Sequence, residues 1–565
     1  MKKVKKEPSP FHLPSTMDII TLIGYNMLHR GPHMPGRLKK HYIFIVFIFL
    51  AALSLSLISC GRTTQEPERI TVRLCAPQSQ YIQDFDANLY KLWLEDMTGL
   101  NIEMIWLAPD DAEAIVRRQL LSGENLPDAY VGFGNTELFS LSNIEFYGTS
   151  GVIIPLNDLI EEYGVHTKAL WRELPEYSIR QNMTATDGNI YFLPGFSSSI
   201  ITRYRQIMWV NAGWLAELSL PVPETTDEFA DMLLAFRDSD PGRIPMAGTS
   251  AHYSKQPYDF LLNAFIYNDI RNARMYLENN RVRFAPITDE WREALKYMHG
   301  LYTEGLYSPL SFSQDNQQFN QMANDPLDIL GAFLSPGITL TVLQNSPEVL
   351  TRYVGMAPLM GPTGVRLTTV FSPIARVNGV ITKAAKHPQE LFLLFDLMLS
   401  EEASLMGRYG EQGVDWDFAG LAEVSIYGTP ATVHIINQIW NTPQNKHLAQ
   451  IVPYVSRPKY SGGVTWDGNT TDGEYINAQA AMLHGDYEPD EYLAILIFAP
   501  DEEARIAPLR AGIEAYVDKA LADFITGERD IYDDAAWATY LNAFDDLGLG
   551  VLISTAQTAY DRDRY

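Results

Sequence analysis

Hydrophobic residues in the first part of the chain alternate between the spacing of strands and the spacing of helices. Ile70 to Leu74 carries apolar side chains at every second position, and Asn101 to Leu107 is again strand-like. Asn88 to Met97 and Asp111 to Leu121 instead carry apolar residues three or four positions apart, and Gly99 ends the first of these helices. Strands that alternate with helices in this order indicate a parallel sheet with crossover helices.

The second half of the chain is richer in helical patterns. Long segments with helical spacing recur at Thr226 to Phe236, Trp291 to Glu304, Pro388 to Ser400 and Ala504 to Ile525. The chain has 565 residues, of which 46% are hydrophobic, and this exceeds what one core usually holds. We therefore predict an α/β protein with two or more lobes.

An apolar run near the N-terminus has the features of a bacterial lipoprotein signal. The run from Tyr42 to Leu57 follows Arg37, Lys39 and Lys40 and leads to a small residue before Cys60. Its length is below the roughly 20 residues of a spanning helix, so cleavage is favoured over the alternative of an uncleaved anchor. We predict lipidation of Cys60, with residues 1–59 as an upstream extension and signal peptide and 60–68 as a tether. The true start is expected at Met34, because residues 1–33 do not read as part of a signal.

Charge and cysteine content exclude several classes of protein. The whole chain has 43 Lys and Arg against 69 Asp and Glu, and removal of residues 1–59 leaves 35 against 67. A strongly acidic protein is poorly suited to nucleic acid or to electrostatic docking on anionic lipid. After Cys60 the only cysteine is Cys75, so neither a disulfide framework nor a cysteine metal cluster is predicted.

Several short motifs occur in the order found in one family of receptors. They are Leu126-Pro127-Asp128, Gly188 to Pro194, Met208 to Asn211 followed by Trp214-Leu215, Leu220 to Phe229, Leu301 to Leu306, and Tyr409 to Trp416. With the lipoprotein signal, this order resembles the extracellular solute-binding proteins of family 1, which are lipid-anchored receptors of sugar ABC importers. The larger oligosaccharide receptors, which include alginate-binding proteins, are the most similar branch.

The resemblance implies a two-lobed fold of the periplasmic-binding-protein type 2 with three hinge crossings. We place the crossings at Gly188 to Pro194, Ile329 to Ser335, and Val380 to Lys383. The first lobe then comprises residues 69–195 and 333–382, and the second comprises 196–332 and 383–565. The alternative is that these segments are ordinary buried strands of one large domain.

A sugar site needs aromatic planes for C–H faces and polar groups for hydroxyls. Trp209 is the first candidate, because it follows a crossing by a short strand. The other candidates near turns or crossings are Tyr258, Trp416, Tyr427, Trp440 and Trp466. For each of them, core packing is the alternative, and the helically spaced Trp93, Trp171, Trp214, Trp291 and Trp537 are assigned to the core.

Arginines beside the first crossing raise the question of an acidic ligand. Arg203 and Arg205 flank Tyr204, and an arginine fork could hold a uronate carboxylate in two hydrogen bonds. A solvated strand edge is the alternative reading of both arginines. A neutral oligosaccharide is the preferred prediction.

Metal and catalytic signatures are weak in this sequence. Many larger oligosaccharide receptors carry a calcium loop that corresponds here to Arg237 to Pro245, but this segment has only Asp238 and Asp240 as carboxylates. The segment Asp467 to Glu474 reads as a polar turn. We predict no metal, no cofactor and no enzymatic activity, since metalloprotease, hydrolase-elbow and phosphate-loop motifs do not occur.

The sequence therefore predicts a monomeric receptor, lipid-anchored on the extracytoplasmic face of the cell membrane. It would capture an oligosaccharide between its lobes and deliver it to the membrane subunits of an ABC permease. Two alternatives remain open: a surface-anchored polysaccharide-degrading enzyme, and a glycan adhesin or sensor partner without a transport role.

Overall fold

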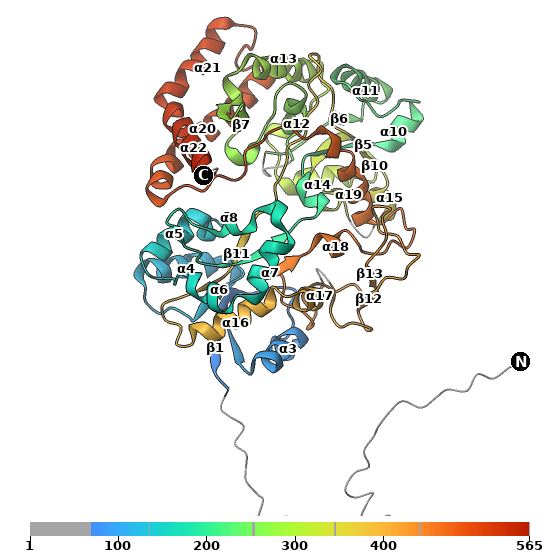
Figure 1. Ribbon diagram of the computed structural model, residues 1–565. Helices are drawn as coiled ribbons and strands as arrows, with labels where there is room; N and C mark the ends of the chain where they lie inside the picture. The colour runs from blue at the N-terminus through green and yellow to red at the C-terminus, as the bar shows by residue number, and fades with distance from the viewer. Residues whose placement is uncertain (1–68, 135, 251–254, 344–345, 440–441, 564–565) are drawn as a thin grey trace, which may run out of the picture. The chain divides into compact units, whose positions relative to one another are not determined.

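A computed structural model describes residues 69–563, apart from residues 135, 251–254, 344–345 and 440–441 (Figure 1). The predicted signal, the tether with Cys60, and Trp440 lie outside the described residues. No helix within the described part is both long enough and apolar enough to cross a membrane.

The first large sheet has six strands. In spatial order these are β14 (Tyr454–Ser456), β4 (Leu193–Ser197), β11 (Arg376–Ile381), β3 (Ala129–Val131), β1 (Thr71–Pro77) and β2 (Asn101–Leu107). β1 is parallel to β2 and β3, and β14 is parallel to β4. β11 is antiparallel to both of its neighbours, so five of the six strands run in one direction.

The second large sheet has four strands. In spatial order these are β10 (Tyr353–Gly355), β5 (Ile207–Asn211), β9 (Leu330–Ser335) and β6 (Ile244–Met246). β6 and β9 are parallel, and β5 is antiparallel to β9 and β10. Two small two-stranded sheets complete the strands: β7 (Met275–Glu278) with β8 (Arg281–Phe284), and β12 (Trp416–Phe418) with β13 (Val433–Ile435).

Each large sheet has its own set of helices and its own core, and we call the two sets the first and the second lobe. The first-lobe core receives side chains from α3 (Leu89–Thr98), α4 (Pro109–Ser122), α5 (Leu141–Thr149), α6 (Asn157–Tyr163), α7 (Val165–Glu173), α8 (Ile179–Met183), α16 (Pro388–Met398) and α17 (Glu401–Tyr409). α18 (Pro458–Ser461) follows β14.

The second lobe contains the remaining helices. They are α9 (Ile200–Arg203), α10 (Ala212–Glu217), α11 (Thr226–Ser239), α12 (Pro257–Leu261), α13 (Asp289–Thr303), α14 (Asn316–Ala323), α15 (Pro347–Leu350), α19 (Gly473–Met482), α20 (Pro500–Thr526), α21 (Asp534–Asp546) and α22 (Leu549–Asp563). α20 packs on α13 and α22, and Figure 1 shows these C-terminal helices in red beside α13.

Local sequence signals explain where several of these elements begin and end. The side chain of Asn88 accepts hydrogen bonds from the N–H groups of Tyr90 and Lys91 and so caps α3. Gly99 ends α3 with a φ of 70°, which a residue with a Cβ adopts at a cost. The predicted strand at Asn101 to Leu107 is confirmed as β2, parallel to β1 as expected.

The chain passes between the two lobes along three segments, which we call the connections. They are residues 198–206 between β4 and β5, residues 356–375 between β10 and β11, and residues 457–472 between β14 and α19. The lobe boundaries predicted at residues 333 and 383 differ from these connections. β9 and β10 pair with β5 in the second lobe, whereas α16, α17 and β14 belong with the first.

The physical reason for this difference lies in strand pairing. The segments around residues 330 and 380 are both apolar and both form strands, as predicted. An apolar run shows that a strand is buried, but it does not show which sheet the strand joins. The predicted second and third crossings at Ile329–Ser335 and Val380–Lys383 are therefore corrected to the last two connections. The first crossing, predicted at Gly188–Pro194, is corrected to residues 198–206, because β4 still belongs to the first sheet.

Candidate ligand-binding site

In both sheets, the connections lie at the edge where most strands have their carboxyl ends. In the first lobe the carboxyl ends of β1, β2, β3, β4 and β14 share one edge, where β11 begins at Arg376. In the second lobe β6, β9 and β10 end at the edge where β5 begins. All three connections attach to these edges. In open α/β sheets, ligands bind outside the carboxyl ends of the strands.

Arginines gather around Phe371 where the second connection approaches β11. The guanidinium of Arg205, on the first connection, lies 6.0 Å from the centre of the Phe371 ring, and that of Arg271 lies 5.0 Å from it. Burial and the neighbouring Arg205 both lower the pKa of Arg376, so these two cations lie within electrostatic reach of each other. Arg271 also pairs with Asp269 at 3.4 Å, and Arg205 Nε donates to the Thr202 carbonyl at 3.2 Å, so the group combines partly engaged cations with an aromatic ring.

Further polar groups extend this group across both lobes. Burial raises the pKa of Tyr454 in β14, and the cations Arg408, Arg457 and Arg376 oppose that shift. Burial raises the pKa of Glu474 in α19, and Arg408 of α17 opposes this rise, so these two groups lie within electrostatic reach of each other.

Trp466 on the third connection forms an accessible aromatic pair. Its ring stacks on Tyr475 of α19 with centroids 4.6 Å apart and an angle of 3° between the planes. The Trp466 Nε1 donates to the carbonyl oxygen of Asn469 at 3.2 Å, which fixes the ring, and both side chains remain partly exposed. A flat, fixed and accessible ring can pack against the C–H face of a sugar.

Tyr427 also lies where the lobes meet. Burial raises the pKa of Tyr427 to about 12, while a hydrogen bond with Ser199 on the first connection opposes the rise. The neighbouring Ile426 carbonyl accepts a hydrogen bond from Gln479 of α19 at 2.7 Å. Tyr427 is partly buried and joins a first-lobe loop to second-lobe elements.

Trp209 does not occupy the predicted position. It lies on β5 with 0% of its surface exposed, and its Nε1 donates to the Ser335 carbonyl at 3.2 Å. The ring belongs to a core cluster with Phe319, Phe333 and Tyr353. All five residues of β5 are buried, so both faces of the strand are covered and Trp209 is a packing residue.

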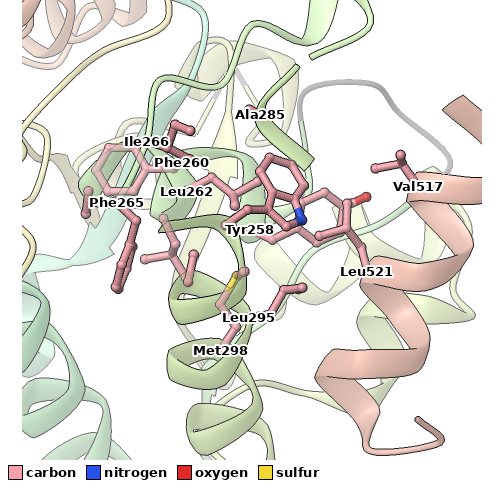
Figure 2. Packing of buried hydrophobic residues seen from close by; sticks show 14 of the residues in the cluster. Tyr258, Phe260, Leu262, Phe265, Ile266, Ala285, Leu295, Met298, Val517 and Leu521 are labelled. Carbon is pink, nitrogen blue, oxygen red and sulfur yellow. The ribbon is translucent and has the colours of Figure 1, made fainter. Parts of the chain in front are cut away.

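Tyr258 and Trp416 are buried as well. Figure 2 shows Tyr258 among Leu262, Val517 and Leu521 in the main core of the second lobe. Trp416 packs in a small cluster with Tyr409 and Tyr460, and its Nε1 donates to the Gly410 carbonyl at 3.0 Å. Neither residue presents a ring face to a ligand in this structure.

Arg203 is already engaged by a carboxylate. Its Nε and Nη2 each lie 2.6 Å from an oxygen of Glu488, and Tyr204 donates to the same carboxylate. The hydrogen bond with Glu488 raises the pKa of Arg203, and burial opposes that rise. A uronate clamp at Arg203 would have to displace Glu488, so the structure does not support that role.

The carboxylates of the expected calcium-loop region are used internally. Asp238 pairs with Arg237 at 2.7 Å, and Asp240 accepts a hydrogen bond from the Gly242 N–H at 2.7 Å. Within the described residues, no group of three or more His, Cys, Asp or Glu side chains is arranged to hold a metal ion.

Sequence reasoning named Arg205 only as a flanking residue and missed Phe371, Arg376 and Tyr475. Their position depends on which strands pair, because Arg376 reaches the site only as the first residue of β11 between β3 and β4. A weak local signal exists, since Phe371 and Arg376 flank Pro373 just before an apolar run.

Comparison with known proteins identifies the family. The sequence profile of the bacterial extracellular solute-binding proteins matches residues 78–404. The chain belongs to this family. It is therefore a binding protein and not an enzyme, and the predicted family resemblance is confirmed.

Two known proteins are similar over much of this chain. The fructooligosaccharide ABC transporter substrate-binding protein FusA of Streptococcus pneumoniae is 25% identical over 502 residues, which are 83% of this chain and 86% of FusA. Lipoprotein LipO of Bacillus subtilis is 23% identical over 411 residues, which are 68% of this chain and 75% of LipO.

Solved structures share the two-lobed α/β fold of this solute-binding protein. FusA in complex with kestose superposes with a TM-score of 0.68 at 21% identity and covers 87% of this chain and 99% of the FusA chain. The alginate-binding protein AlgQ2 superposes with a TM-score of 0.62 at 20% identity and covers 88% of this chain and 98% of the AlgQ2 chain. The predicted two-lobed α/β architecture is thus confirmed.

Proposed function

We propose that this solute-binding protein captures an oligosaccharide at the connections and delivers it to the membrane subunits of an ABC importer. One observation carries the proposal. The sheet edges that hold the carboxyl ends of most strands lie at the connections, and the connections also carry Arg205 and Phe371, next to Arg376, and the accessible Trp466, which stacks on Tyr475. Aromatic faces and half-buried donors together suit sugar rings and their hydroxyls. FusA, named as a fructooligosaccharide receptor, supports a carbohydrate ligand.

The direct test is calorimetric binding of defined oligosaccharides. Kestose is the first ligand to try, because FusA has been solved with it. Maltotriose, cellotriose and trigalacturonate extend the series to other linkages and to an acidic sugar. Saturable binding of at least one of them supports the proposal, and failure of a broad glycan array to bind would remove the carbohydrate assignment.

Closure of the two lobes is the proposed mechanism of capture. Three connections allow bending at a few residues each while keeping the lobes in register, which is the arrangement of a hinge. Ligand held by both lobes should make the protein more compact and raise its melting temperature. Small-angle scattering with and without ligand measures the change, and an unchanged radius of gyration at saturation argues against closure.

The lipid anchor on Cys60 is a separate part of the proposal. Replacement of Cys60 by alanine removes the sulfur that carries the lipid, so labelling with a radioactive fatty acid should be lost and the protein should leave the membrane fraction. The name of LipO as a lipoprotein supports this assignment. Equal labelling of both proteins would contradict it. A monomeric receptor that acts on the extracytoplasmic face remains our proposal.

A glycan adhesin or sensor partner is the second candidate. It would share the binding site but would not depend on a permease. Loss of sugar uptake in a strain without this protein supports transport, whereas intact uptake with loss of sugar-dependent adhesion or signalling supports the second candidate.

A further inference from the structure

The two lobes also contact each other outside the three connections. The second lobe makes this contact with residues 493–499, directly before α20, which we call the strap. The first lobe contributes α5, α8 and the residues before β4. α20 itself contacts α5, and Figure 1 shows α5 below the red C-terminal helices.

The side chains of the strap alternate between the two lobes. Leu496 and Phe498 are buried in the main core of the second lobe. Ile497 lies between them and is 6% exposed, but its side chain lines a small apolar hollow of the first lobe. Successive side chains of an extended chain point to opposite sides, so the strap is anchored in one lobe and reaches into the other.

The hollow fits Ile497 closely. Its first-lobe walls include Ile144 of α5, Met183 of α8, and Tyr191 and Phe192, all of which belong to the first-lobe core. The space that remains is about 10 Å³, which is no larger than one water molecule needs. Ile497 therefore completes the packing of a core to which its own lobe does not belong.

A hydrogen bond accompanies this apolar contact. The Ser142 Oγ of α5 donates to the Phe498 carbonyl oxygen at 3.2 Å. Ser142 lies in the first lobe and Phe498 in the strap, so the bond joins the two lobes beside the hollow.

The strap is also fixed to its own lobe through its backbone. Arg562 of α22 donates from Nη1 to the Ile497 carbonyl oxygen at 3.2 Å, and its Nη2 lies 2.6 Å from a carboxylate oxygen of Glu502. The other oxygen of Glu502 accepts the Ala499 N–H at 2.9 Å. The strap is thus held on both sides of Phe498, and Ile497 is presented in a fixed position.

Separation of the lobes would break this contact. Leu496 and Phe498 would stay in the second-lobe core, while Ile497 would leave the hollow and both apolar surfaces would meet water. We propose that the strap holds the two lobes closed before any ligand binds, with Ile497 docked in the first lobe and Phe498 bonded to Ser142.

The docked strap also sets the affinity for a ligand that both lobes enclose. The apparent dissociation constant equals the intrinsic constant of the closed form divided by the closed fraction. A variant that lowers the closed fraction therefore raises the dissociation constant by the same factor. This consequence rests on the proposed capture of a sugar, whereas the closed fraction itself is measured without any sugar.

Single-molecule energy transfer on the full-length protein in detergent measures the closed fraction. Fluorophores are attached at Leu121→Cys and Leu327→Cys, whose positions are 62% and 82% exposed and lie at the sheet edges away from the connections. The background carries Cys60→Ala, and Cys75 is buried. We expect the wild type to populate a closed form without sugar.

Three variants of the contact should shift this population. Ile497→Ala should lower the ratio of closed to open molecules by at least about tenfold. Ser142→Ala removes only the hydrogen bond and should lower the ratio by about threefold. Ile497→Asp would bring a carboxylate into the apolar hollow, so most molecules should be open, and the dissociation constant for kestose should rise by the factor by which the closed fraction falls.

Leu496→Ala is the matched control. Leu496 is the neighbouring residue of the strap and is 8% exposed, but it packs in the second-lobe core. Its replacement should lower the melting temperature and leave the ratio of closed to open molecules unchanged.

The same measurements can overturn the proposal. A wild type that is fully open without sugar would do so, as would Ile497→Asp with an unchanged closed fraction. An equal fall of the ratio in Leu496→Ala and Ile497→Ala would show a general loss of stability in place of a specific contact. If none of the oligosaccharides binds but the ratio falls in Ile497→Ala alone, the capture of a sugar is contradicted and the role of the strap stands.

Discussion

Trp209 lies in the middle of a four-stranded sheet, whereas Trp466 lies on a segment that joins two sheets. The ring of Trp209 is fully covered and its N–H is bonded to the Ser335 carbonyl at 3.2 Å on the neighbouring strand. The ring of Trp466 is partly exposed, and its N–H is bonded to the Asn469 carbonyl at 3.2 Å, only three residues away. One ring is fixed by the core and the other by its own turn.

The difference shows how a receptor can hold an aromatic ring still without burying it. β5 is buried along its whole length, so its aromatic ring stabilises the lobe. A residue on a connection lacks that cover, and here a local hydrogen bond and the stacked Tyr475 ring replace it. Pre-organisation of this kind lowers the entropy cost of binding.

The largest effect is expected at Trp209. Trp209→Ala removes a fully buried indole from the core and should lower the free energy of unfolding by about 3 to 5 kcal/mol. Denaturant unfolding measures this loss. Calorimetry on the folded fraction should give an unchanged affinity for kestose or another bound sugar, and a stable variant with lost affinity would restore Trp209 to the binding site.

The core cluster around Trp209 should also be sensitive to acid. It includes Tyr204, whose ring stacks on His484 with centroids 5.8 Å apart. Burial lowers the pKa of His484 to about 4, below the usual value of about 6.5 in an unfolded chain. The unfolded state therefore binds more protons between these values, and stability present above pH 6.5 is lost as the pH falls towards 4.

The expected loss from His484 is about 3 kcal/mol by pH 4. The unfolding free energies of the wild type and of His484→Gln are measured from pH 7 to pH 4.5. The difference between the two curves removes the contribution of the carboxylates, which both proteins share. His447 in the first lobe, whose pKa burial also lowers to about 4, provides the comparison variant. A flat difference curve for His484 would contradict the argument.

An intermediate effect, on affinity rather than stability, is expected at Trp466. If Trp466 packs against a sugar as proposed, Trp466→Ala removes a ring worth on the order of 1 to 3 kcal/mol by buried area, so affinity should fall about ten- to hundredfold. Because the ring is partly exposed, unfolding free energy should change by less than about 1 kcal/mol. Trp466→Phe keeps a ring and should recover part of the affinity. Unchanged affinity in the alanine variant would remove Trp466 from the site.

Most individual elements could be predicted from the sequence, because their signals are local. The cap at Asn88, the glycine at Gly99 and the alternation of β2 all act within a few residues. Membership in a lobe could not be predicted in the same way. β9 and β11 are both apolar strands, and only their pairing partners distinguish them: β9 pairs with β5 and β6, and β11 pairs with β3 and β4.

The candidate site depends on the same non-local information. Arg376 is an ordinary arginine in the sequence and reaches the site only because β11 begins where its neighbours end. Trp466 could be selected from its place in a turn-rich segment, but the same criterion selected Trp416, which the fold buries. Composition and spacing therefore give candidates, and strand topology decides among them.

The smallest effect is expected at Arg203, which lies on the first connection but, like Trp209, already has its hydrogen-bond partner within the protein. Its side chain and that of Glu488 are 27% and 25% exposed, and two hydrogen bonds of 2.6 Å join them. At this exposure, solvent screening reduces the value of the pair, and a double-mutant cycle with Arg203→Gln and Glu488→Gln should give a coupling energy of about 1 kcal/mol. Affinity for a neutral trisaccharide should not change in either variant. Arg203→Lys keeps the charge but loses the bidentate hydrogen bonding, so it should recover only part of the coupling. A coupling near zero, together with a selective loss of trigalacturonate binding, would show that Arg203 binds the ligand. Exposure on a connection would then be sufficient to identify a binding residue.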